Sequence, residues 1–149
     1  MANLTGSSTA EIEAPLERVW AVVADVEKAP DWQGGLKSMR ATQRDGDGRA
    51  ILCDSESDAK VRSLKSTVRF SYDAPTKLGW TQEKGELKSV VGSWDLQDLG
   101  DGRTRATYSL EVDLGRVLGM VIRGPLVDVL RGMLINARAG ELKRRVEGG

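Results

Sequence analysis

The sequence predicts an α+β protein in which an antiparallel sheet is covered on one face by a long C-terminal helix. Three observations lead to this prediction. The middle of the chain alternates apolar and polar residues, a period of two that is typical of strands with one covered face. Only short turns separate these segments, which leaves no room for the crossover helices of a parallel sheet. The last part of the chain repeats apolar residues at helical spacing. We expect one domain over residues 1–149.

The first elements are a strand and two short helices. Small or apolar residues alternate with polar ones over residues 8–13, which favours a strand. Pro15 suits the first turn of a helix, because the missing N–H has no partner there. Apolar residues then recur at helical spacing from Leu16 to Val23. A second short helix or turn is expected over residues 26–32.

Further strands follow, and turns rich in Asp, Gly and Pro bound them. They are expected over residues 36–44, 49–56, 61–72, 77–83, 89–98 and 104–114. The last one has the clearest pattern, with Ala106, Tyr108 and Leu110 on one face and charged or polar residues on the other. The sheet should therefore have about six to seven strands.

A long helix is expected over residues 116–146, with a kink or break at Gly124–Pro125, because proline removes a helical hydrogen bond. At about 100° per residue, one face of this helix is apolar. That face contains Leu118, Ile122, Leu126, Val129, Met133 and Ala137. A row of arginines is expected on the opposite face, pointing to water. The row contains Arg116, Arg123, Arg131, Arg138 and Arg145.

Composition excludes several classes of protein. Lys and Arg together number 22, as do Asp and Glu, so the net charge is zero and a globally basic nucleic-acid binder is not expected. The chain has no histidine, which excludes Ser-His-Asp and Cys-His catalysis. Without histidine and with one cysteine, Cys53, we expect neither a metal site nor a cofactor. No phosphate-binding loop or nucleophile elbow is present.

The sequence also predicts where the protein resides. Residues 1–5 lack the basic flank and apolar run of a signal peptide. The most apolar stretch contains Arg123, Asp128 and Arg131, which would lie in the middle of a bilayer, so no transmembrane segment is expected. The lone Cys53 cannot form an intramolecular disulfide. We therefore expect a cytoplasmic protein.

Several segments resemble one family. They are residues 11–20 (EIEAPLERVW), 23–27 (VADVE), 30–32 (PDW), 92–96 (GSWDL) and 102–108 (GRTRATY). In order and spacing they resemble the START-like, helix-grip superfamily, the polyketide cyclase/dehydrase and lipid-transport group. The resemblance implies a curved sheet that wraps the C-terminal helix, with a cavity between them. Members bind lipids, sterols, polyketides or plant hormones there, some are aromatases or cyclases, and some bind other proteins.

Large apolar and aromatic side chains on the two facing surfaces are the candidate ligand contacts. These residues are Phe70, Trp80, Trp94, Tyr108, Leu110, Leu126, Val129 and Met133. The alternative for each of them is an ordinary role in the core. Since the expected inner face is mostly apolar, the leading hypothesis is non-catalytic binding or transport of a hydrophobic small molecule such as a lipid or polyketide.

Two other functions stay open at this point. A polyketide cyclase or aromatase would use Tyr72 and Tyr108 as hydrogen-bond donors to a ligand carbonyl. A protein-interaction module would use the arginine row of the C-terminal helix. The sequence leaves the ligand, the oligomeric state and the pathway undetermined.

Overall fold

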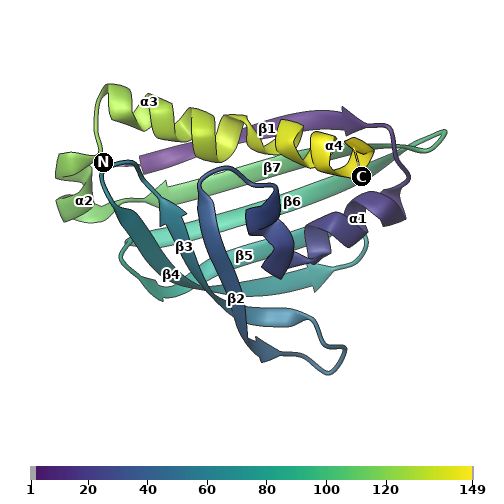
Figure 1. The fold of residues 1–149 in the computed structure, drawn as a ribbon, viewed down its shortest axis with the longest axis horizontal. Coiled ribbons are helices and arrows are strands. Elements are labelled where there is room, and N and C mark those ends of the chain that lie inside the picture. The colour runs from purple at the N-terminus through teal and green to yellow at the C-terminus, as the bar shows by residue number, and fades with distance from the viewer. Residues whose placement is uncertain (1–2, 149) are drawn as a thin grey trace.

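The computed structural model describes residues 3–148 (Figure 1). The sheet strands are β1 (Asn3–Ile12), β2 (Leu36–Arg44), β3 (Ala50–Asp58), β4 (Ser63–Asp73), β5 (Lys77–Gly85), β6 (Ser89–Gly100) and β7 (Arg103–Asp113). The helices are α1 (Leu16–Ala24), the 3-10 helix η1 (Val26–Asp31), α2 (Gly115–Val121), α3 (Pro125–Arg131), the π-helical η2 (Gly132–Asn136) and α4 (Arg138–Gly148).

The strands form one seven-stranded sheet in the order β1-β7-β6-β5-β4-β3-β2, and every neighbouring pair is antiparallel. The first strand therefore pairs with the last, from Asn3 opposite Asp113 to Ile12 opposite Thr104. All the helices of Figure 1 lie on one side of this sheet. This arrangement confirms the predicted α+β class and the helix-grip architecture.

The first strand is longer than predicted, since β1 begins at Asn3 and not at residue 8. Apart from Leu4, its early residues are small or polar, so they carry little hydrophobic pattern. Small side chains are needed here because this strand lies directly against the helical segment. A Cβ built at Gly6 would lie 3.4 Å from Cγ2 of Ile135, and the backbone N–H of Ala139 donates to Ser8 Oγ at 3.1 Å. Small side chains on β1 thus allow the helix to pack closely on the sheet.

Bulges bend the sheet, because an extra residue in one strand curves it locally. The pairing of β2 with β3 shifts register between Ala41 and Gln43, and that of β4 with β5 shifts between Thr67 and Val68. In Figure 1, β2, β3 and β4 cross the flatter part of the sheet at an angle. A bent sheet has a covered face that one helix alone does not fill.

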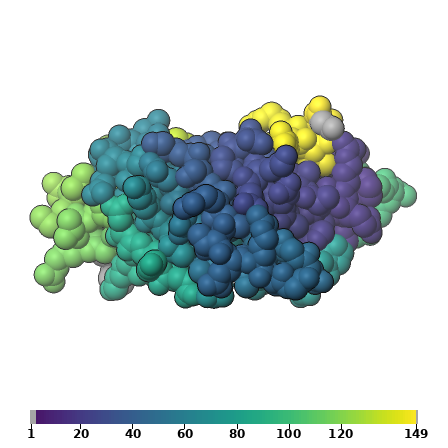
Figure 2. Space-filling view, turned by 60° about the horizontal axis from the view of Figure 1, so that its bottom comes forward, coloured from purple at the N-terminus to yellow at the C-terminus, as the bar shows by residue number. Residues whose placement is uncertain are grey.

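The C-terminal helical segment has two irregularities. The predicted break is confirmed, since α2 ends at Val121 and Gly124 adopts φ +64° directly before α3. Beyond it, η2 is a π-helical stretch between α3 and α4, and such a stretch widens the helical turn. Figure 1 shows α3 and α4 as one continuous rod across the sheet. Figure 2 shows that α2 protrudes at one end of the molecule, far from α1.

The predicted inward face of this segment is wrong in part beyond the break, although Leu126 and Met133 pack against the core as expected. Val129 is 52% exposed, whereas its neighbour Leu130 is buried. Arg138, predicted to point to water, is only 3% exposed. A single helical period from residue 118 to 137 assumes an unbroken helix. The break and the π-helical turn each change the phase, and they bring different residues against the sheet.

Within residues 3–148, none of the helices has the length and apolar character that crossing a bilayer requires.

Candidate ligand cavity

A cavity of about 160 Å³ lies between the sheet and the helical elements. All seven strands contribute to its wall, and α1, η1 and the C-terminal helical segment close it from the other side. Most of the lining side chains are apolar or aromatic. The space follows from the fold, because the helical segment packs closely on β1 at one edge of the sheet while the bulged strands β2 to β5 curve round the other side.

Five of the predicted contact residues line this cavity: Phe70, Trp80, Trp94, Tyr108 and Leu110. Their aromatic rings form a continuous row across four strands. The ring centroids of Phe70 and Trp80 lie 6.1 Å apart, those of Trp80 and Tyr108 5.6 Å, and those of Trp94 and Tyr108 4.9 Å. Such a row offers a large apolar surface with polar N–H and O–H groups at its edges.

The other three predicted residues, Leu126, Val129 and Met133, are not among the side chains that line the cavity. Leu130, Leu134 and Arg138 form the helical wall in their place. The cause is the change of helical phase described above. An assignment of the three residues as ligand contacts therefore has no support from the cavity geometry.

Trp80 contributes to the wall because of Gly92, which lies opposite it on β6. A Cβ at Gly92 would collide with the Trp80 indole, and three ring atoms lie nearest to it. Because Gly92 has no side chain, the indole is able to lie flat over it on the sheet. An aromatic side chain that covers a glycine on the neighbouring strand is a known stabilising arrangement.

Arg138 is the cationic side chain of the lining and the main feature that sequence reasoning missed. Its Nη1 donates to the carbonyl oxygen of Gly34 at 2.9 Å and to Oε1 of Glu141 at 2.7 Å. The guanidinium carbon lies 5.6 Å from the centroid of the Tyr108 ring, a cation–π distance. The only sequence signal for this arrangement is the Arg138–Glu141 spacing, which suits an ion pair on one helix face.

Tyr108 is buried beside this guanidinium. Burial raises the pKa of its phenol, and the neighbouring charge of Arg138 offsets part of that rise. The hydroxyl is therefore protonated at neutral pH and is able to donate a hydrogen bond.

Tyr72, the other candidate donor, has a different role. Its hydroxyl donates to the carbonyl oxygen of Ala50, and its ring packs edge-on against Trp20. Burial raises the pKa of Tyr72 to about 12. Tyr72 does not line the cavity. Its hydrogen bond ties β4 to the start of β3, which is a structural role.

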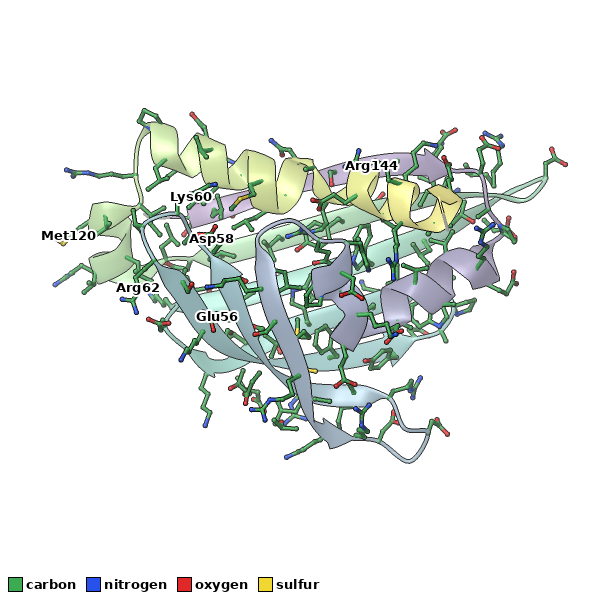
Figure 3. All side chains as sticks on the ribbon, in the orientation of Figure 1. Glu56, Asp58, Lys60, Arg62, Met120 and Arg144 are labelled. Atoms are coloured by element: carbon green, nitrogen blue, oxygen red, sulfur yellow. The ribbon has the colours of Figure 1, made fainter. Side chains whose placement is uncertain are left out.

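Polar side chains line the cavity at β3 and β4. Ser55, Ser57 and Ser66 belong to this group, and the Ser55 hydroxyl donates to the carbonyl oxygen of Ser66 at 3.1 Å. Asp58 also lines the cavity and accepts a hydrogen bond from the backbone N–H of Lys60 at 2.8 Å. Figure 3 shows Asp58 and Lys60 below the helical segment, toward the α2 end of the molecule.

The comparison with protein families decides the classification. The model of the family described as "Polyketide cyclase / dehydrase and lipid transport" matches residues 3–147. The chain belongs to this family. The resemblance of its sequence segments to the polyketide cyclase/dehydrase and lipid-transport group is thereby confirmed. None of the curated proteins matches the sequence.

Solved structures share the fold of this family member over nearly its whole length. A START superfamily protein from Mycobacterium smegmatis is 23% identical, with a TM-score of 0.81, and 97% of each chain is covered. A protein from Thermus thermophilus is 21% identical, with a TM-score of 0.77, over 96% of this chain and 98% of that one. The Zhui aromatase/cyclase from a Streptomyces species is 18% identical, with a TM-score of 0.67, over 98% and 85%. At these identities the likeness establishes the fold.

Proposed function

We propose that the protein binds a hydrophobic small molecule, such as a lipid or a polyketide, in the cavity between the sheet and the C-terminal helical segment. The observation that carries the proposal is the row of aromatic rings from Phe70 to Trp94 along one wall of the cavity. Ligand sites are typically concave and largely apolar, with few polar groups that set orientation. Family membership supports the same function.

The first test is a search for a bound ligand. Native mass spectrometry after mild extraction should detect a co-purified hydrophobic molecule. In a protein stripped of ligand, a lipophilic fluorescent dye should bind with one-to-one stoichiometry, and the extracted molecule should displace it. If neither a co-purified molecule nor saturable dye binding is found, the proposal is rejected.

A matched pair of variants locates the dye. Trp80 lines the cavity, whereas Trp20 packs against Tyr72 outside the lining. Because a ring contact contributes about 0.5–1.5 kcal/mol beyond its buried area, Trp80→Ala should weaken dye binding roughly two- to tenfold or more. Trp20→Ala should leave the dissociation constant unchanged. Equal effects of both variants would place the dye elsewhere.

A second candidate function is cyclisation of a polyketide, and one observation favours it. Tyr108 stays protonated and lies beside the Arg138 guanidinium in the cavity wall, so a phenol donor and a cation are neighbours there. A donor with a nearby positive charge is able to polarise a ligand carbonyl and stabilise charge that develops on its oxygen. A linear poly-β-ketone thioester should then give a cyclised product that depends on the protein and decreases with Tyr108→Phe. An identical product mixture without protein would exclude this activity.

A further inference from the structure

Helix α2 carries apolar side chains that the described part of the chain leaves uncovered. Val117 is 74% exposed, and Met120 and Val121 are each more than half exposed. Single exposed apolar residues are common, but residues spaced i, i+3 and i+4 are neighbours on one helix face. Leu118, on the other side of the same helix, is buried in the core. One face of α2 therefore anchors it, and the outer face is a candidate interaction surface.

The helix also projects from the rest of the molecule. Gly115 at its start and Gly124 beyond its end both have left-handed backbone, with φ +78° and +64°, so the chain turns sharply on both sides of α2. Figure 2 shows the resulting projection at one end of the molecule. A convex projection buries little area against a rigid protein surface, whereas a stable protein interface buries more than about 1,000 Å². Its shape favours a partner that deforms around it.

Cationic side chains border the apolar face. Arg116 and Arg123 lie near the two ends of α2, and both are exposed. Lys60, in the turn between β3 and β4, is exposed as well, and Figure 3 shows it toward the same end of the molecule as Met120. None of the three cations forms an ion pair within residues 3–148. We call this surface the basic tip, which consists of Lys60, Arg116, Val117, Met120, Val121 and Arg123.

The acidic side chains next to the basic tip have other partners. Glu86 forms an ion pair with Arg62, and a carboxylate oxygen of Asp113 lies 3.8 Å from Nζ of Lys88. The Asp58 carboxylate lines the cavity and accepts a hydrogen bond from the backbone N–H of Lys60. The charges of the basic tip are therefore left for a partner, and that partner should be anionic.

We propose that the basic tip docks on an anionic lipid bilayer, with its three apolar side chains among the acyl chains and its three cations at the headgroup phosphates. Interfacial elements of this kind combine an apolar face with Lys or Arg, and both contribute to the strength of binding. A bilayer also deforms around a convex projection. The inference concerns the outer surface, so it holds whether or not the cavity binds a ligand.

Vesicles of two compositions test the role of charge. The protein should sediment with vesicles made of equal parts phosphatidylglycerol and phosphatidylcholine, and much less with phosphatidylcholine alone. Because salt screens exposed charges, an increase from about 0.05 to about 0.5 M NaCl should weaken binding to the anionic vesicles. Equal binding to both kinds of vesicle, or binding to neither, would overturn the inference on the wild-type protein alone.

Two pairs of substitutions locate the charged contact. Arg116→Gln with Arg123→Gln should weaken binding to anionic vesicles roughly tenfold or more, because each basic residue at such a surface contributes about fivefold. The control is Arg144→Gln with Arg145→Gln, which removes two exposed arginines of α4, away from α2. It should change binding by less than about twofold, since charges beyond a Debye length from the bilayer are screened. Equal losses in both variants would contradict docking through the basic tip.

A fluorescent label reports insertion of the apolar face. Met120→Cys and Arg144→Cys each provide an exposed thiol for an environment-sensitive nitrobenzoxadiazole dye, while Cys53 is buried. On anionic vesicles, emission from position 120 should move to shorter wavelength and gain intensity, because the dye leaves water. Emission from position 144 should stay unchanged. The same response at both positions would contradict insertion of α2.

The apolar substitutions distinguish a bilayer from a second copy of the chain. Val117→Gln with Met120→Gln should weaken vesicle binding at least about fivefold, because less apolar area is removed from water. Sedimentation equilibrium without lipid should show a monomer for both this variant and the wild type. A wild-type dimer that the two substitutions dissociate would assign the face to self-association and overturn the inference. Dye binding in the cavity, measured separately, would be unaffected by that outcome.

Discussion

The indole of Trp80 on β5 occupies the space that a side chain at Gly92 on β6 would need. The two residues are register partners, and the missing Cβ lets the ring lie on the sheet where it forms part of the cavity wall. The shape of the site thus depends on a residue that has no side chain.

Gly92→Ala should therefore destabilise the protein. The new Cβ displaces the indole or bends β6, and such overpacking typically costs about 1–3 kcal/mol. Urea unfolding measures the loss. Gly132→Ala is the control, because a Cβ at Gly132 meets nothing within 4 Å and alanine favours helices over glycine by up to about 1 kcal/mol. A loss in the control that equals the loss in Gly92→Ala would contradict the packing argument.

The helical phase gives a second prediction. Leu130 is buried at 1% exposure and its neighbour Val129 is mostly exposed, so truncation at the two positions should differ. Leu130→Ala should lower the free energy of unfolding by about 2–5 kcal/mol. Val129→Ala should change it by less than about 0.5 kcal/mol. The reverse order would instead support the apolar face predicted from the sequence, in which Val129 points inward.

Thr104 supports the connection between β1 and α1. It is fully buried, and its Oγ1 donates to the carbonyl oxygen of Ala14 at 2.8 Å. Thr104→Val keeps the shape but leaves that carbonyl without this partner, which should cost about 1–3 kcal/mol. Thr107→Val is a control on the same strand, because its hydroxyl takes part in an exposed contact with Thr9. Thermal unfolding should separate the two variants clearly.

Alkaline pH should destabilise the protein through Cys53. Burial, followed by the nearby charge of Glu27, raises the pKa of this thiol from 9.0 to about 11. The folded state thus holds its proton where the unfolded chain releases it. The contribution to stability is complete below about pH 9 and falls as pH rises toward about 11, by about 2–3 kcal/mol in total.

Urea unfolding at pH 8, 9.5 and 11 should show this decrease in the wild type. Cys53→Ala lacks the thiol, so its decrease should be smaller over the same range, while the tyrosine contributions remain in both proteins. Parallel stability profiles for the two proteins would exclude Cys53 as the cause. At pH 8 the folded thiol should also react slowly with thiol reagents, because the thiolate is the reactive form.

The strands were predictable from sequence because side-chain direction alternates strictly along them. Tyr108 and Leu110 share the parity of Ala106 on β7, so the alternation alone places them on the covered face. The helical wall was not predictable in this way. A count at 100° per residue assumes that each helical turn is regular, so one irregular turn misplaces every residue after it. Two such irregularities occur here, the left-handed backbone at Gly124 and the π-helical turn.

The polar part of the cavity wall escaped prediction for a related reason. Arg138 looks like one member of a solvated arginine row, and only the three-dimensional phase of α4 turns it inward. Ser55 and Ser57 lie on a strand of mixed polarity, where neither face has an apolar pattern. The covered face of a strand or helix is predicted from the spacing of its apolar residues. Polar residues that point into a cavity do not contribute to that spacing, so they are not recognised.

The pairing of β1 with β7 has a consequence for synthesis on the ribosome. Asn3–Ile12 is made before every other strand of the sheet, yet its partner, Arg103–Asp113, emerges only after the five strands β2 to β6. Until β7 is synthesised, the backbone groups of β1 that pair with it therefore have no partner strand. Contacts between residues so distant in sequence also slow folding. A nascent chain arrested before β7 should be readily cleaved by proteases and bound by chaperones, because β1 then lacks its partner strand.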